Sequence, residues 1–120
     1  MPKKISKAWK SFERRVANFF NTTRTPLSGG NSKVTRSDTF HPHLFIECKT
    51  RKSFAFHTTY KDAKEKAKKE GKLPILITQE KGSHGFLISL HCDDLDTFLN
   101  LYNKIQWQKR NLNKLIKEGE

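Results

Sequence analysis

One short segment, residues 44–49, constrains the fold of this chain more than any other. Residues 44–46 are apolar with strand character, and Glu47, Cys48 and Lys49 follow them directly. In a strand, successive side chains alternate between faces, so Glu47 and Lys49 project together while Cys48 points the other way, toward the core. Charged side chains are costly in a core strand unless they are paired or bind a ligand. The segment therefore predicts a strand that carries a functional site.

A second carboxylate lies a few residues earlier. Asp38 stands among turn formers and begins a short extended stretch, residues 37–40, which the turn at residues 41–43 joins to the strand. His41 and His43, within that turn, are better interpreted as solvated turn residues than as ligands. One carboxylate from the turn, one from the strand and an ammonium on the same face make a compact site for a metal ion and a phosphate.

Phosphodiester hydrolysis needs an activated water and stabilised charge on the phosphate, and Mg²⁺ bound by hard oxygen ligands can serve both needs. Asp38 and Glu47 would supply oxygens, and the carbonyl of Cys48 a third. Lys49 would orient the attacking water or counter the phosphate charge. Glu13, beside the apolar stripe of the expected first helix, could add another acid. The alternative is a surface Glu47–Lys49 pair and an ordinary turn aspartate; the strand context and the basic charge of the chain favour the site.

Charge and length set the class of protein. The chain has 120 residues and a formal net charge of +12, from 24 Lys and Arg against 12 Asp and Glu. So basic a chain attracts polyanions, of which nucleic acid is the commonest, and a membrane partner is less favoured because no segment approaches the roughly 18 apolar residues of a spanning helix. We expect one domain, with a core at residues 1–103 and a helical tail at about 104–120.

The cysteines and the N-terminus predict an intracellular, cytoplasmic protein. Cys48 and Cys92 form no CxxC pair, and free thiols are the favoured interpretation, with a disulfide between them as the alternative. No apolar segment of a secretory signal follows the basic N-terminus.

Periodicity and turn residues predict a mixed α/β (α+β) fold, a central mixed sheet flanked by helices. Ser6 is expected to cap the first helix, Thr59 and Asp62 to form a capping box, and Gly71 to end the second helix. The expected helices are 6–21, 59–70, 93–102 and 104–117, and the expected strands are 37–40, 44–49, 54–57, 74–79 and 85–90, with an edge segment at 22–27.

The chain resembles the PD-(D/E)XK nucleases, and specifically the archaeal-type and phage Holliday-junction resolvases. The resemblance runs in order through Phe12-Glu13-Arg14, Ser28-Gly29-Gly30, Ser37-Asp38 and Ile46-Glu47-Cys48-Lys49, and covers about residues 8–90. Glu-x-Lys alone is a weak signal, whereas the four motifs in sequence are a strong one. Ser37 replaces the proline that names the motif, and the segment from Gly85 onward has no counterpart.

The resemblance implies a restriction-endonuclease-like core and a metal-dependent active centre. Glu13, Asp38 and Glu47 would be the metal-linked acids, Lys49 the catalytic cation, and Ser28 a contact to the scissile region. The expected cofactor is Mg²⁺, with Mn²⁺ able to substitute. The expected partner is DNA, in the form of a four-way junction, whose two-fold symmetry suits a homodimer.

DNA contacts are expected mainly with the phosphate backbone. Arg14 follows the family pattern, and the glycines of the loop allow close approach of the backbone to a ligand. The candidate DNA-binding residues are Arg14, Arg15, Gly29, Gly30, Lys33, Arg36, Arg51, Lys61, Lys64 and Lys68. Two alternatives stay open: an endonuclease for other branched, flap or duplex DNA, and a non-catalytic nucleic-acid-binding module.

Overall fold

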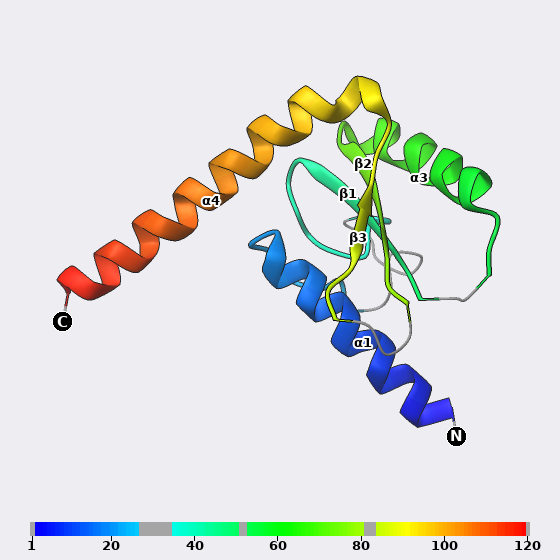
Figure 1. Cartoon of the computed structure of the whole chain (residues 1–120), viewed down its shortest axis with the longest axis horizontal. Helices are drawn as coiled ribbons and strands as arrows, with labels where there is room; N and C mark the ends of the chain where they lie inside the picture. Colours follow the sequence, from blue (N-terminus) through cyan, green and yellow to red (C-terminus); the bar gives the residue numbers. More distant parts are fainter. Residues whose placement is uncertain (1, 27–34, 51–52, 81–83, 120) are drawn as a thin grey trace. The chain divides into compact units, whose positions relative to one another are not determined.

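The computed structural model describes residues 2–26, 35–50, 53–80 and 84–119, with the backbone alone for residues 2–7. Within these residues the fold is mixed α/β, with three α-helices and a three-stranded mixed sheet, as the sequence predicts (Figure 1). The elements are α1 (Pro2–Phe19), β1 (Leu44–Lys49), α3 (Phe56–Glu70), β2 (Leu73–Thr78), β3 (Leu87–Ser89), a 3₁₀ turn (Cys92–Asp94) and α4 (Leu95–Glu118).

The chain divides into two compact units, residues 1–90 and residues 91–120. The sheet, α1 and α3 belong to the first unit, and the 3₁₀ turn and α4 form the second. The expectation of a single domain stays a prediction. In the described part of the chain, no helix is both long enough and apolar enough to cross a membrane.

The strand order is β1-β2-β3, with β1 parallel to β2 and β2 antiparallel to β3. The parallel pairing follows from the crossover through α3, because parallel neighbours cannot be joined by a tight turn. α3 packs on the sheet through Ala63 and Ala67, which cluster with Phe45 of β1. Together, α3 and β2 bury the apolar run of β1. The edge of β1 that faces away from β2 is contacted by the segment before β1.

The apolar stripe of α1 is confirmed: Phe12 and Val16 are buried, and so is Phe20, directly after the end of the helix. Phe12 also meets the ring of Phe86 edge to face, at 6.3 Å between centroids. The expected N-cap at Ser6 is wrong, because the helix already begins at Pro2, a residue whose fixed φ suits a first helical position.

α1 also ends earlier than expected, at Phe19. Asn21, at the predicted end of the helix, has a φ of 57°. Asparagine tolerates this left-handed conformation better than most residues, and it stops the helix there.

Two expectations around α3 are wrong. Residues 54–57 form no strand; Phe56 and His57 already belong to the first turn of the helix. The N-cap is Ala55, which makes no side-chain cap hydrogen bond, so the capping box is also absent. Alternation over four residues cannot separate a strand from a helix start. The end of α3 is confirmed, since Gly71 is left-handed with a φ of 67°.

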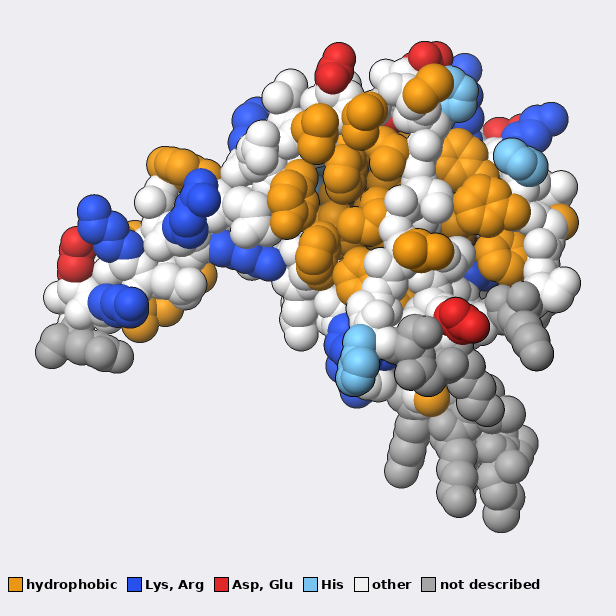
Figure 2. Space-filling view, in the orientation of Figure 1, with side chains coloured by type: hydrophobic (Ala, Val, Ile, Leu, Met, Phe, Trp, Pro, Cys, Tyr) orange, Lys and Arg blue, Asp and Glu red, His pale blue; other side chains and the backbone are white. Residues whose placement is uncertain are grey.

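The C-terminal unit contains one long helix where the sequence suggested two. α4 runs without a break from Leu95 to Glu118, after the 3₁₀ turn. Neither glycine nor proline stands near residue 103, so nothing ends the helix there. Hydrophobic and basic side chains alternate along its C-terminal half (Figure 2), where Trp107, Leu112, Leu115 and Ile116 are exposed.

Candidate metal-binding site

The edge of β1 is covered by the segment that carries Asp38. The backbone N–H of Asp38 donates to the carbonyl of Ile46 at 2.9 Å. The hydroxyl of Ser37 accepts from the N–H of Ile46 at 2.8 Å and donates to its carbonyl at 3.2 Å. The expected strand at 37–40 is therefore wrong: a serine side chain replaces part of the ladder, and strand-like pairing is limited to one bridge between Arg24 and Thr39.

This arrangement buries the Asp38 carboxyl, which is 7% exposed, against β1. Its Oδ2 accepts a hydrogen bond of 2.7 Å from the backbone N–H of Cys48. Burial raises the pKa of Asp38 to about 8, and the nearby Glu47 carboxyl adds to the rise, while the Cys48 N–H opposes it. The protonated form of Asp38 is therefore favoured when no cation is bound.

Glu13 reaches the same place from α1. Its side chain is fully buried, and Oε1 accepts a hydrogen bond of 2.7 Å from Nε of Arg24. Oε2 is buried and has no hydrogen-bond partner. Burial raises the pKa of Glu13, the Arg24 guanidinium lowers it, and the Glu47 carboxyl raises it further. Glu13 and Asp38 are close enough for the charge of each to affect the other.

Glu47 and Lys49 project from the same face of β1, as predicted. Both residues are half-buried, whereas Ile46 and Cys48 are buried on the other side. Nζ of Lys49 lies 3.4 Å from Oε1 of Glu47. Burial raises the pKa of Glu47, and the ammonium groups of Lys49 and Lys66 lower it.

Cys48 contributes its backbone and not its sulfur. Its side chain is buried, and burial raises the pKa of its thiol well above the ordinary value, so a thiolate ligand is unfavourable. The N–H and C=O of one strand residue point to the same side, so the carbonyl of Cys48 faces the same edge as the N–H that donates to Asp38. Cys48 and Cys92 are both free cysteines in the structure, as the favoured interpretation expects, with Cys48 buried and Cys92 exposed.

These groups suit a hard cation in their chemistry. Three carboxyls have raised pKa values, and Glu47 contributes to the rise at both Asp38 and Glu13. A divalent cation would relieve this repulsion. The acids are neighbours but not a tight cluster: in the described parts of the chain, three ligating atoms lie within 4.8 Å of one another only at His91, Cys92 and Asp93.

That exposed cluster belongs to the start of the C-terminal unit. Nδ1 of His91 already accepts the backbone N–H of Asp93 at 3.1 Å, as the cap of the 3₁₀ turn. The three residues are consecutive and exposed, so their proximity follows from the turn itself.

Arg24 is a site residue that the sequence reasoning missed. It binds Glu13, and its guanidinium also lies over the ring of Trp9, at 5.5 Å from the centroid. The bridge from Arg24 to Thr39, and the hydrogen bond from Thr25 N–H to the Asp38 carbonyl, bring this segment beside the site. The one available signal was the β-favouring composition of residues 22–27, which does not indicate a partner.

Some of the candidate DNA-binding residues are described by the structure and others are not. Arg14, Arg15 and Arg36 are exposed, and Arg15 Nη2 donates to Gln79 Oε1 at 3.2 Å. The lysines expected to contact DNA on α3 are all exposed: Lys61, Lys64 and Lys68. Five predicted site residues lie outside the described residues: Ser28, Gly29, Gly30, Lys33 and Arg51.

Comparison of the chain with family models, with curated proteins and with solved structures gives no significant match. The resemblance to the PD-(D/E)XK nucleases therefore stays a prediction. The structure shows where the three acids lie: Glu13 is on α1, Asp38 is in the loop before β1, and Glu47 is on β1. Each of them influences the pKa of another. The position of the serine-glycine loop relative to them is outside the described residues.

Proposed function

We propose that this chain is a Mg²⁺-dependent DNA endonuclease with a restriction-endonuclease-like core, which hydrolyses phosphodiester bonds in branched DNA as a Holliday-junction resolvase does. The observation that carries the proposal is the buried Oε2 of Glu13, which has no hydrogen-bond partner and lies in the same cluster of acids as Asp38, whose pKa is raised to about 8. Buried acids that repel one another destabilise a fold. Their presence in so basic a chain is explained by a cation that binds them.

Glu13, Asp38, Glu47 and the carbonyl of Cys48 would hold the metal ion. Bound Mg²⁺ would supply positive charge that acidifies a water molecule and stabilises the phosphate oxygens. The N–H of Cys48 keeps the Asp38 carboxylate oriented, and Arg24 lowers the pKa of Glu13 and so favours its ionised form. Asp38 has to release its proton before it can act as a ligand, so binding of the ion is favoured by rising pH.

Lys49 is the residue best placed to serve the reaction directly. Its side chain is one-third exposed, and its 3.4 Å contact with Glu47 leaves the other donors of the ammonium available for a water molecule or a phosphate oxygen. In this role it orients the attacking water and offsets the charge that develops on the phosphate.

The net charge of +12 supports DNA as the partner. Phosphate contacts supply most of the affinity of such proteins and carry no sequence information. A homodimer would present two sites to the two strands of a symmetric four-way junction. The described candidate DNA-binding residues would follow the backbone: Arg14, Arg15, Arg36, Lys61, Lys64 and Lys68.

Cleavage of a synthetic four-way junction in Mg²⁺ tests the proposal. We expect Lys49→Ala to lower the cleavage rate by about 10²-fold or more, since it removes a charge that acts on the transition state. Lys69→Ala, which removes an exposed lysine of α3 with the same change in charge, is the matched control and should cut like the wild type. Equal product from the wild type and Lys49→Ala would contradict the enzyme assignment.

The substrate is tested separately, by comparing rates on the junction, a Y-fork and plain duplex. Preference for the fork or the duplex would replace the resolvase assignment with an endonuclease for other DNA. A non-catalytic binding module predicts salt-sensitive DNA binding, no metal-dependent cutting and no effect of Asp38→Asn on affinity. The buried acids argue against such a module, because carboxylates repel phosphate.

A further inference from the structure

Lys66 differs from the other lysines of α3. The helix carries Lys61, Lys64, Lys66, Lys68 and Lys69, and all of them except Lys66 are exposed. Lys66 is half-buried because it lies next to Ala67 and three residues after Ala63, the two alanines through which α3 is buried. It therefore stands at the border between the packed face of the helix and solvent.

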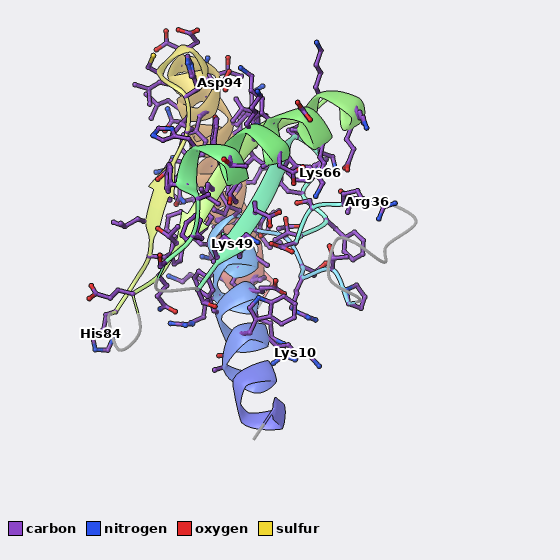
Figure 3. All side chains as sticks on the ribbon, turned by 90° about the vertical axis from the view of Figure 1, so that its right-hand side faces the viewer. Lys10, Arg36, Lys49, Lys66, His84 and Asp94 are labelled. Carbon is purple, nitrogen blue, oxygen red and sulfur yellow. The ribbon has the colours of Figure 1, made fainter. Side chains whose placement is uncertain are left out.

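The charges that face Lys66 belong to the candidate site. Its ammonium lowers the pKa of Glu47 on β1, after burial and Lys49, and Glu47 in turn acts on Lys66. Arg36, on the segment that leads to Asp38, is a further cation close to Lys66. Figure 3 shows Lys49, Lys66 and Arg36 on three different elements around the same region of the molecule. Lys49 and Lys66 thus both act on Glu47.

The present partner of Lys66 is weakly bound. Nζ of Lys66 lies 2.9 Å from Oδ2 of Asp62, one helical turn earlier, and the Asp62 side chain is 62% exposed. A partly exposed ion pair at this spacing adds little to stability. A phosphate oxygen offers the same charge and the same acceptor chemistry as a carboxylate. Phosphate can therefore displace Asp62 at little cost.

We propose that Lys66 binds a DNA backbone phosphate next to the scissile one, and that Asp62 holds the ammonium in place until DNA arrives. The inference rests on the proposed function for the position of the scissile phosphate. It assigns separate tasks to two nearby lysines: Lys49 acts on the reacting phosphate, and Lys66 fixes the strand beside it.

The test measures affinity for a synthetic four-way junction in EDTA, where no cleavage occurs, between about 50 and 200 mM salt. Lys66→Gln should weaken binding about tenfold and reduce the slope of log K against log salt by about one, the effect of one lost phosphate contact. Lys69→Gln, with the same change in charge on the same helix, should leave the slope unchanged. Lys66→Arg should keep the slope, and Asp62→Asn should tighten binding because it removes a competitor.

Equal slopes and affinities for Lys66→Gln and Lys69→Gln would overturn the inference, as would tighter binding by Lys66→Gln. Far-UV circular dichroism of each variant confirms that the fold is kept. Cleavage by the wild type separates the two proposals. A wild type that cuts the junction while both glutamine variants bind alike overturns the role of Lys66 alone. A wild type whose binding depends on Lys66 but that never cuts overturns the endonuclease alone.

Discussion

The two carboxyl oxygens of Glu13 have different surroundings. Arg24 donates to one of its oxygens, and the other is buried without a hydrogen-bond partner. Removing Arg24 would leave a fully buried acid without its cation, which typically costs about 3 kcal/mol or more. We expect Arg24→Gln to lower the free energy of unfolding in urea by about that amount at pH 7.

The double variant Glu13→Gln with Arg24→Gln is the control for this prediction. It should recover much of the lost stability, because no buried charge is left unpaired. Additive losses from the two single changes would show that the pair is not coupled.

The dependence of stability on pH that we expect from Asp38 has the opposite sign to that of an ordinary salt-bridged acid. Its folded pKa, about 8, lies above the ordinary value of 3.8, so the folded state binds the proton more tightly than the unfolded state. The metal-free protein should therefore lose stability as the pH rises from about 4 to about 8. Asp38→Asn, which keeps an oxygen for the Cys48 N–H, should remove this loss and be more stable than the wild type at pH 8 by more than about 1 kcal/mol. Parallel curves of unfolding free energy against pH for the two proteins would contradict this prediction.

At this scale, the sequence predicted the acids better than their surroundings. Alternation along β1 correctly placed Glu47 and Lys49 together and buried Cys48. The apolar stripe of α1 placed Glu13 beside the core, but it did not show that the side chain is fully buried. Arg24 was missed because its partner is defined by tertiary contact between α1 and a segment with no periodic pattern.

At the scale of elements, the long and periodic segments were predictable and the short ones were not. β1 and β2 follow their apolar runs closely, and Gly71 ends α3 as expected. Residues 37–40 read as a strand because they are extended and precede an apolar run. Their hydrogen bonds go instead through the side chain of Ser37, which composition does not reveal.

The turn before β1 depends on His41. Its Nδ1 accepts the backbone N–H groups of His43 and Leu44, each at 3.0 Å, and the residue is 5% exposed. Burial lowers the pKa of His41 to about 4, and His43 and Lys72 lower it further. The unfolded chain binds this proton more readily, so the stability is fully present above about pH 6.5 and is lost as the pH falls through 4.

The fall amounts to at most about 3 kcal/mol, at about 1.4 kcal/mol for each pKa unit. His41→Asn should keep the turn, since the amide oxygen can replace Nδ1 as acceptor, and should flatten this part of the stability curve. Urea unfolding between pH 4 and pH 7 measures both. If the free energy of unfolding of the variant fell between pH 7 and pH 4 as steeply as that of the wild type, another group would cause the acid sensitivity.

At the scale of the whole molecule, a metal ion would link the buried acids to the stability of the first unit. Because the unfolded chain has no preformed site, an ion that binds the native state stabilises it, by about 2.7 kcal/mol at a hundredfold excess over the dissociation constant. Mg²⁺ should therefore raise the melting temperature of the wild type, and EDTA should reverse the rise. The effect should grow from pH 6 to pH 8, as Asp38 gives up its proton more readily.

The matched variant is Asp38→Asn with Glu47→Gln, which removes two of the acids and keeps similar side-chain volumes. It should show no response of the melting temperature to Mg²⁺. A control in which Asp93 of the exposed 3₁₀ turn is replaced by Asn should respond like the wild type, because its cluster is built by the turn and does not involve the buried acids. If Mg²⁺ stabilised the double variant as much as the wild type, the ion would bind elsewhere, and the buried acids would need another explanation.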